Sequence, residues 1–193
     1  MKMKKKNLIV LAEIAIFAAI GFVLDLIANF ISNFFPNGGS IGIAMIAVII
    51  ITYRRGIIPG FITGLLMGLL DMTDGYYAIA DTFFKVFFQI GFDYLFGYAF
   101  VCVCGFIKPL CKKNFILFTT IGAFIGGMGK YLSHFLSGIF FWPEFPNQPF
   151  LERVWYSIGY NGSYMIPSII LSTAIICLLA YKAKMIFEIK DNK

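Results

Sequence analysis

Charge is the scarcest property of this sequence of 193 residues. Only 13% of the residues are charged, about half of the roughly 25% that is usual in soluble domains. Hydrophobic residues make up 60%, and the mean hydropathy is +0.84. These values exclude a disordered chain and a water-soluble nucleic-acid-binding domain, even though the formal net charge is +6. The composition predicts an all-α integral membrane protein.

The motifs of common enzyme and metal sites are missing as well. The sequence has no G-x-x-x-x-G-K-[ST], H-E-x-x-H or G-x-S-x-G string and only one histidine. Its four cysteines lie in or beside apolar stretches without metal-ligand spacing, so we expect no cofactor, metal or redox role for them. Because each bilayer span needs about 20 residues, the spans take up most of a chain of this length and leave no room for a nucleotide-binding domain. We therefore predict a protein that is not an enzyme and depends on another subunit for any ATP-driven work.

Long apolar stretches are what the sequence has in abundance. Six of them predict one six-helix transmembrane domain over residues 1–193, with spans at about 8–35, 41–53, 57–72, 82–106, 115–141 and 154–181. The second span is short, so we expect it to be tilted or partly buried by its neighbours. The first is too long for a signal peptide, so we expect it to be a retained helix.

Basic residues gather in the two tails and in alternate loops. They are Lys2, Lys4, Lys5, Lys6, Arg54, Arg55, Lys108, Lys112, Lys113, Lys182, Lys184, Lys190 and Lys193. The remaining loops are acidic or mixed and hold Asp71, Asp74, Glu144, Glu152 and Arg153. Because Lys and Arg mark cytoplasmic loops, both termini are expected to be cytoplasmic in a multi-pass plasma-membrane protein.

Small residues recur at helical spacing in three spans. Glycines 60, 64 and 68 lie four residues apart in the third span, and Gly122 and Gly126 do so in the fifth. Such stripes let helix backbones approach closely in lipid, so we expect the glycines to lie at helix contacts inside the bundle. Ala15 and Ala19 form a similar patch on the first span.

Ionisable residues inside the spans are costly and therefore mark a binding site or an ion pair. Asp93 lies halfway along the fourth span, and Lys130 and His134 share a face of the fifth. One interpretation is that Asp93 pairs with Lys130 and joins two helices; the other is ligand binding. His134 suits a core hydrogen bond equally well, and Asp25 is expected at a wetted position in the outer half of the first span.

Aromatic and amide groups cluster on the predicted outer side, at Trp142, Trp155, Tyr156, Tyr160 and Asn161. An interfacial aromatic belt accounts for part of this cluster, but not for the amide. A buried carboxylate, aromatic faces and an amide together suit a flat, cationic, hydrogen-bonding small molecule. The residues therefore indicate binding or transport.

Several strings, in this order and spacing, carry a family resemblance. They are Glu13 to Ala19, Gly38 to Ser40, Tyr53 to Gly56, Gln89 to Tyr94, Lys130 to Phe135, Gly138, Phe141-Trp142, Tyr156-Ser157 and Asn161-Gly162. The sequence resembles the thiamine-specific substrate-binding subunits (S components) of energy-coupling-factor vitamin transporters over most of its length.

The resemblance implies a six-helix bundle that captures thiamine from outside and joins a membrane scaffold subunit and two cytoplasmic ATPases. It implies that the vitamin contacts Asp93, Trp142, Tyr156 and Asn161, with Lys130 and His134 lining or supporting the same pocket. For Ala15 and Ala19 it implies a docking face for the scaffold subunit. The permanently charged thiazolium ring and flat aminopyrimidine of thiamine fit the pocket inferred from the residues.

Three features depart from the family pattern. The acid at position 93 is the shorter aspartate, a frequent tryptophan of the third helix is replaced by Met67, and the stretch from Gly75 to Asp93 is long. Tyr76 and Tyr77 are candidates for the missing aromatic wall. An S component for another vitamin or a thiamine precursor is therefore the alternative, and a membrane scaffold protein that binds no ligand is the alternative from a different class.

Overall fold

The computed structural model describes residues 5–32, 35, 38–76, 78, 80, 82–141 and 148–188. Within these ranges the chain is all helical, and the predicted fold class is confirmed. The elements are α1 (Lys5–Ile31), α2 (Met45–Arg55), α3 (Ile57–Asp74), α4 (Phe83–Ile90), the π-helical turn η1 (Gly91–Leu95), α5 (Phe96–Ala99), the 3₁₀-helical segment η2 (Phe100–Lys112), α6 (Phe115–Phe140), α7 (Phe150–Lys182) and the 3₁₀ turn η3 (Lys184–Ile186).

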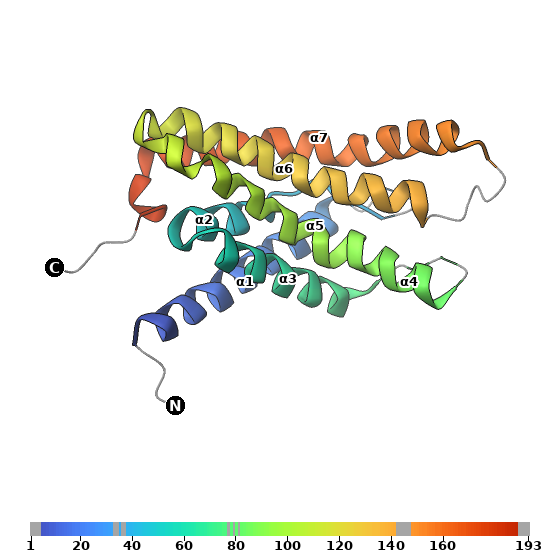
Figure 1. Cartoon of the computed structure of the whole chain (residues 1–193), viewed down its shortest axis with the longest axis horizontal. Helices are drawn as coiled ribbons and strands as arrows, with labels where there is room; N and C mark the ends of the chain where they lie inside the picture. Colours follow the sequence, from blue (N-terminus) through green and yellow to red (C-terminus); the bar gives the residue numbers. More distant parts are fainter. Residues whose placement is uncertain are drawn as a thin grey trace.

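The helices form an elongated bundle in which the start of α1 and the turn η3 lie at the same end of the molecule (Figure 1). Helices α6 and α7 run side by side, and the rod that begins with α4 and ends with η2 lies against α6. Helix α1 crosses α2 and α3 and packs against both. We call the end that carries the start of α1 and η3 the terminal end, and the other the distal end.

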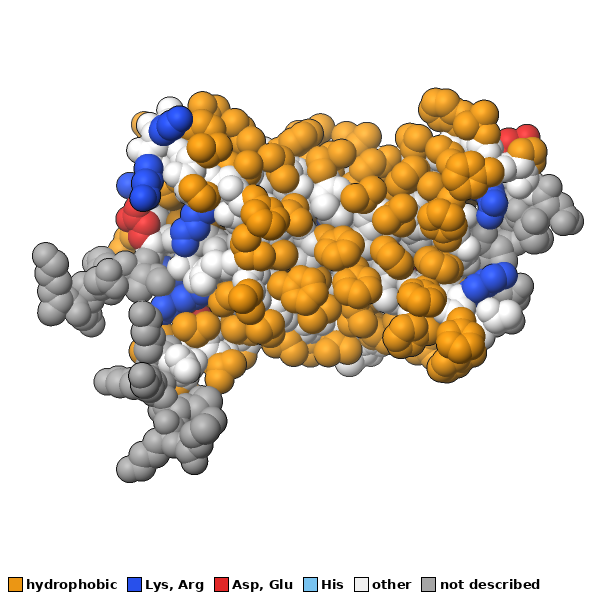
Figure 2. All heavy atoms as spheres, in the orientation of Figure 1, with side chains coloured by type: hydrophobic (Ala, Val, Ile, Leu, Met, Phe, Trp, Pro, Cys, Tyr) orange, Lys and Arg blue, Asp and Glu red, His pale blue; other side chains and the backbone are white. Residues whose placement is uncertain are grey.

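Five helical segments in the described part of the chain are long and apolar enough to cross a membrane. They are Asn7–Ile31, Ile57–Asp74, Phe83–Lys112, Phe115–Phe140 and Phe150–Lys182. Figure 2 shows the apolar side chains covering the middle of the bundle, with charged side chains gathered at its two ends. This distribution matches a bilayer core flanked by water, because only the ends can hydrate charges.

Helix α2 has only 11 residues, so at about 1.5 Å per residue it covers about half of a 30 Å hydrocarbon core. Every residue from Met45 to Tyr53 is buried. The short second span is therefore the central helix of the bundle, surrounded by protein. Its continuous apolar sequence reflects burial in protein, because a helix that is hydrophobic on all sides has no polar face to expose.

Several helix ends differ from the ranges expected from hydropathy. Helix α1 ends at Ile31 and α7 begins at Phe150, and the rod that starts at Phe83 continues through Pro109 to Lys112. Helix α7 and the rod are longer than expected because hydropathy follows the thickness of the hydrocarbon, whereas a helix continues into the headgroup region as long as its backbone hydrogen bonds are made. Helix α1 instead ends four residues before the expected end of its span at about residue 35.

Close contact between α3 and the rod depends on two glycines. A Cβ atom on Gly64 would lie 2.5 Å from the carbonyl oxygen of Tyr98, and one on Gly68 would lie 2.4 Å from that of Tyr94. Both distances are too short for any larger residue, so the prediction that the glycine stripe of the third span mediates packing is confirmed. The contact holds the end of α3 beside η1, where Asp93 lies.

Candidate functional site

A cavity of about 460 Å³ lies between the helices in the distal half of the bundle. Its lining comes from α1, the segment before α2, α3, the rod, α6 and α7: Asp25, Asn29, Gly38, Gly39, Ser40, Gly42, Ala44, Met45, Asp71, Asp74, Gly75, Tyr76, Asp93, Tyr94, Tyr98, Lys130, His134, Gly138, Tyr156, Tyr160, Asn161, Tyr164, Met165 and Ser168. The volume is within the range of about 300–1,000 Å³ that is usual for small-molecule pockets.

The π-helical turn η1 places Asp93 at the cavity wall. A π turn inserts one extra residue into a helix and leaves a backbone carbonyl free of its ordinary partner. Here the carbonyl of Phe92 accepts a hydrogen bond of 2.6 Å from the hydroxyl of Ser133 on α6. The bond ties the irregular turn to α6, whose next residue, His134, faces the same cavity.

Asp93 approaches His134 across the helix interface. The Oδ1 atom of Asp93 lies 3.5 Å from Nδ1 of His134, and both side chains are largely buried. The other ring nitrogen of His134, Nε2, has no hydrogen-bond partner among the described residues and faces Gly97 of α5. Asp93 therefore lies beside the histidine, and Lys130 has a different set of neighbours.

Lys130 belongs to a second charged group at the α1 and α3 side of the cavity. Its ammonium nitrogen lies 3.5 Å from the centre of the Tyr98 ring and interacts electrostatically with Asp25 and Asp71. The Tyr98 hydroxyl donates a hydrogen bond to Asp25. Lys130 therefore lies with Asp25 and Asp71 rather than with Asp93. Hydropathy cannot predict this grouping, because its three residues come from three different helices.

The expectation of a wetted Asp25 is wrong, since only 6% of this residue is exposed. A carboxyl group so deeply buried needs polar partners. Tyr98 and Lys130 supply them, one from the rod and one from α6.

Tyrosines from α7 form the opposite wall of the cavity. Tyr156 and Tyr160 stack with ring centroids 5.7 Å apart, and the Tyr160 hydroxyl donates to the carbonyl of Gly38 at 2.8 Å. Gly39 has a φ of +101° and leaves no room for a Cβ atom against the Tyr164 ring. The Gly38 to Ser40 segment therefore closes on α7 because glycine alone fits both its backbone conformation and the close contact.

Asn161 joins α7 to α6 and orients the cavity wall. Its amide nitrogen donates to the backbone oxygen and the hydroxyl of Ser157, at 3.0 Å each, and to the backbone oxygen of His134 at 3.3 Å. Its side-chain oxygen accepts a 2.6 Å hydrogen bond from the Tyr164 hydroxyl. That oxygen has a second lone pair, which is the capacity left for a ligand.

Five of the residues singled out from the sequence are brought together at this cavity: Asp93, Lys130, His134, Tyr156 and Asn161. Trp142 and Tyr77 lie outside the described residues. Tyr76 lines the cavity, whereas Met67 is buried against Gly21 of α1. Trp155 is 64% exposed and is not part of the lining, as expected of an interfacial aromatic residue.

The sequence reasoning missed several lining residues, among them Tyr94, Tyr98 and Tyr164. Tyr94 directly follows Asp93, and Tyr98 lies one helical turn after Tyr94, so the two tyrosines share a helix face next to the one that carries the acid. Tyr164 is likewise one turn after Tyr160. Asp71 lies within α3, inside the span expected at about 57–72, and is not one of the loop residues with which its charge groups it.

Carboxyl groups outnumber amines in the cavity lining. Among the described lining residues, Asp25, Asp71, Asp74 and Asp93 supply four carboxyl groups, and Lys130 supplies the one side-chain amine. Six tyrosines also line it. Carboxylates and aromatic faces both attract cations, so this arrangement suits an organic cation with a flat ring.

Comparison with known proteins agrees with this geometry. A family model described as thiamine transporter protein (Thia_YuaJ) matches residues 11–188. The chain belongs to this family. It is 33% identical over 185 residues to the thiamine transporter ThiT of Bacillus subtilis, covering 91% of this chain and 92% of the relative. It is 29% identical over 197 residues to ThiT of Lacticaseibacillus paracasei, covering 97% and 94% of the two chains.

The fold matches a solved structure of this family as well. A structure of ThiT from Listeria monocytogenes superposes with a TM-score of 0.76 at 27% identity, over 96% of this chain and all of the other. Membership of the thiamine transporter protein family confirms the resemblance stated from the sequence. The chain is accordingly a multi-pass plasma-membrane protein of a transport family, and it is not an enzyme.

Proposed function

We propose that this protein binds thiamine in the distal cavity and is the S component of an energy-coupling-factor transporter. The observation that carries the proposal is the charge of the cavity, with four carboxyl groups and six tyrosines around one lysine. The thiazolium ring of thiamine carries a permanent positive charge, and both of its rings are flat. The names of the relatives, all thiamine transporters, support the same ligand.

Two sides of the cavity have different tasks in this proposal. Asp93 neutralises the thiazolium charge, and His134, held beside it at 3.5 Å, fixes the orientation of the carboxylate. Tyr156 and the remaining acceptor of Asn161 hold the aminopyrimidine, which offers hydrogen-bond donors and a flat face. Trp142 is expected to contact the vitamin as well, as the family resemblance implies.

Calorimetric titration of the detergent-solubilised protein with thiamine tests the ligand, with Asp93→Asn and Glu152→Gln as a matched pair. Both variants lose one carboxylate, but Glu152 is exposed at the start of α7 and outside the cavity lining. We expect Asp93→Asn to weaken binding at least tenfold, about 1.4 kcal/mol, and Glu152→Gln to change it less than twofold.

The outcomes of this titration separate the alternatives. If the folded protein does not bind thiamine but binds an aminopyrimidine precursor or another vitamin, the cavity is assigned to that ligand. Absence of any ligand, with Asp93→Asn altering only thermal stability, supports the scaffold interpretation and contradicts the proposal.

The partners in this proposal are a membrane scaffold subunit and two cytoplasmic ATPases. Ala15 and Ala19 are exposed on one face of α1, one helical turn apart. An exposed small-residue face allows a second helix to approach closely in lipid. We therefore expect α1 to dock on the scaffold subunit at this face.

Bulky substitutions test the docking face. Ala15→Trp with Ala19→Trp should abolish thiamine uptake in cells that carry the partner subunits, while the purified variant binds thiamine with unchanged affinity. Leu178→Trp is the control, because Leu178 is 58% exposed on α7, away from α1. Equal loss of uptake in the control variant would contradict the docking role.

Orientation is also part of the proposal, with the terminal end in the cytoplasm. Lys113 lies exposed between η2 and α6, and Glu152 is exposed at the distal end. In a background without the four native cysteines, a membrane-impermeant maleimide added to intact cells should label Glu152→Cys and leave Lys113→Cys unlabelled. The reverse pattern would place the distal cavity on the cytoplasmic side.

A further inference from the structure

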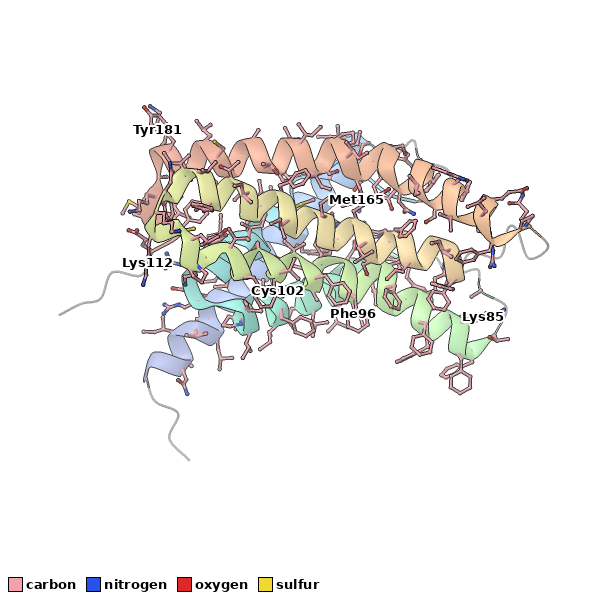
Figure 3. The ribbon with its side chains drawn as sticks, turned by 45° about the horizontal axis from the view of Figure 1, so that its top comes forward. Lys85, Phe96, Cys102, Lys112, Met165 and Tyr181 are labelled. Carbon is pink, nitrogen blue, oxygen red and sulfur yellow. The ribbon has the colours of Figure 1, made fainter. Side chains whose placement is uncertain are left out.

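A second hollow, of about 1100 Å³, lies at the terminal end and is separate from the distal cavity. It lies between the link from α2 to α3, the end of η2, the start of α6 and the segment around η3. Its lining consists of Tyr53, Arg55, Gly56, Ile57, Ile58, Pro59, Gly105, Lys108, Pro109, Cys111, Lys112, Phe115, Lys184, Phe187 and Glu188. Figure 3 shows Lys112 at this end of the bundle and Lys85 at the other.

The charge of this basic hollow is strongly unbalanced. Its described lining holds four cationic side chains and a single carboxylate. Arg55 donates a 2.7 Å hydrogen bond to Glu13 of α1, and Lys184 pairs with Glu188 at 3.0 Å. Lys108 and Lys112 are exposed, and neither has an acidic partner in the part of the chain that the structure describes.

The walls of the basic hollow are apolar and continue into the lipid-facing surface. Ile57, Pro59 and Phe115 line it. Ile58, also in the lining, is 73% exposed, and Phe106, between two lining residues of η2, is 69% exposed. An occupant must therefore combine an anionic group with long apolar chains, and these chains have a path along the bundle surface.

We propose that the basic hollow binds an anionic phospholipid, with its phosphate at Lys108 and Lys112 and its acyl chains along Ile58 and Phe106. Basic pockets between transmembrane helices near a membrane surface are suited to such headgroups, because each Lys or Arg there strengthens the attraction to anionic lipid. The N-terminus of α3 adds to the attraction, since Gly56 has no side chain to cap the first backbone N–H groups. A free phosphate ion would contact only the charged side chains and would not cover the apolar walls.

Native mass spectrometry of the full-length protein, with equal amounts of phosphatidylglycerol and phosphatidylcholine added, tests the proposal. We expect retained phosphatidylglycerol in the wild type, and at least tenfold weaker retention in the Lys108→Gln/Lys112→Gln variant. The matched control is Lys113→Gln/Lys182→Gln, which removes the same charge from exposed positions at the same end but outside the hollow. Size-exclusion profiles and circular dichroism establish that both variants are folded.

The control variant should retain phosphatidylglycerol like the wild type. If both variants lose phosphatidylglycerol equally, the lipid is held by general charge attraction and the proposal is overturned. Equal retention of phosphatidylglycerol in both variants would also overturn it. Displacement of the lipid by millimolar inorganic phosphate would assign the hollow to a small anion. If Lys108→Gln/Lys112→Gln instead breaks the complex with the scaffold subunit and leaves lipid retention unchanged, the occupant is a protein.

Discussion

The distal cavity and the basic hollow lie at opposite ends of one bundle and have opposite charge. The distal cavity has four carboxyl groups and one lysine, whereas the basic hollow has four cationic groups and one carboxylate. The carboxyl groups of the cavity come from α1, α3 and the rod, and two of them, Asp25 and Asp71, are partnered by Lys130. Lys108 and Lys112 instead project from the surface at the end of η2.

The difference shows how position decides the role of a charge in a membrane protein. A carboxylate inside the bundle is costly and persists because a ligand or a partner compensates it. A lysine at the membrane surface costs little and attracts anionic headgroups. Four experiments test this contrast, beginning with the one expected to have the largest effect.

Removing the carboxyl groups of Asp25 and Asp71 should leave Lys130 without its acidic neighbours in the distal cavity. We expect Asp25→Asn with Asp71→Asn to weaken thiamine binding about 100-fold, because a cationic ligand then meets an uncompensated Lys130 and about 2.8 kcal/mol is lost. Calorimetric titration measures the effect, and Glu152→Gln with Glu188→Gln serves as the control for lost charge. Unchanged affinity in the cavity variant would show that Asp25 and Asp71 serve the fold alone.

Restoring the longer acid at position 93 separates charge from length. We expect Asp93→Glu to bind thiamine within about tenfold of the wild type, a difference of at most 1.4 kcal/mol, because the carboxylate is kept. Asp93→Asn in the same titration should bind more weakly than Asp93→Glu. If the two variants lose equal affinity, the position of the carboxylate in η1 matters more than its charge.

Removing a charge at the terminal end should lower the stability of the fold without changing the affinity for thiamine. Glu13 accepts hydrogen bonds from both Arg54 and Arg55, and Arg54 also donates to the backbone oxygens of Ile186 and Glu188. We expect Glu13→Gln to cost about 2 kcal/mol, the usual range for hydrogen bonds to a charged group, and to lower Tm by several degrees. Thermal unfolding in detergent measures the loss, and a changed thiamine affinity would refute the separation of the two ends.

Two aromatic residues that are adjacent in sequence should differ in their contribution to thiamine affinity. Trp155 is 64% exposed, whereas Tyr156 stacks on Tyr160 at the cavity wall. We expect Trp155→Phe to change thiamine affinity less than twofold, and Tyr156→Ala to weaken it about tenfold through loss of the stacking surface. Similar effects of the two substitutions would place the ligand nearer to the interface than the distal cavity.

Much of the candidate site was predictable because its residues are anomalous in their surroundings. Asp93, Lys130 and His134 are ionisable groups in apolar helices, and Asn161 is an amide at the same depth. Because burying such groups in a membrane costs free energy, their presence alone indicates a functional site. Asp25 carries the same anomaly, but its place in the outer half of the first span suggested a wetted position, and the charge of Asp71 grouped it with the loop residues. Depth along a helix does not reveal burial, which depends on whether another helix covers that face.

The tyrosines were harder to predict for a different reason. Tyrosine is common both at membrane interfaces and in binding sites, so its presence does not distinguish the two. Only the register of α7 separates Tyr156 and Tyr160, which face the cavity, from Trp155, which faces outward.

By itself, the sequence determined an all-helical membrane protein with polar residues that must meet inside it, because apolar stretches and buried charges each permit few arrangements in lipid. The family resemblance added the expected ligand and the list of candidate contacts. The sequence also indicated that the second span is partly buried, but only the folded bundle shows that α2 is buried from Met45 to Tyr53, that Asp93 faces His134 from a π-helical turn, and that Lys130 lies with Asp25 and Asp71. These features arise from contacts between helices distant in sequence, and the close approach allowed by Gly64 and Gly68 fixes which polar groups meet.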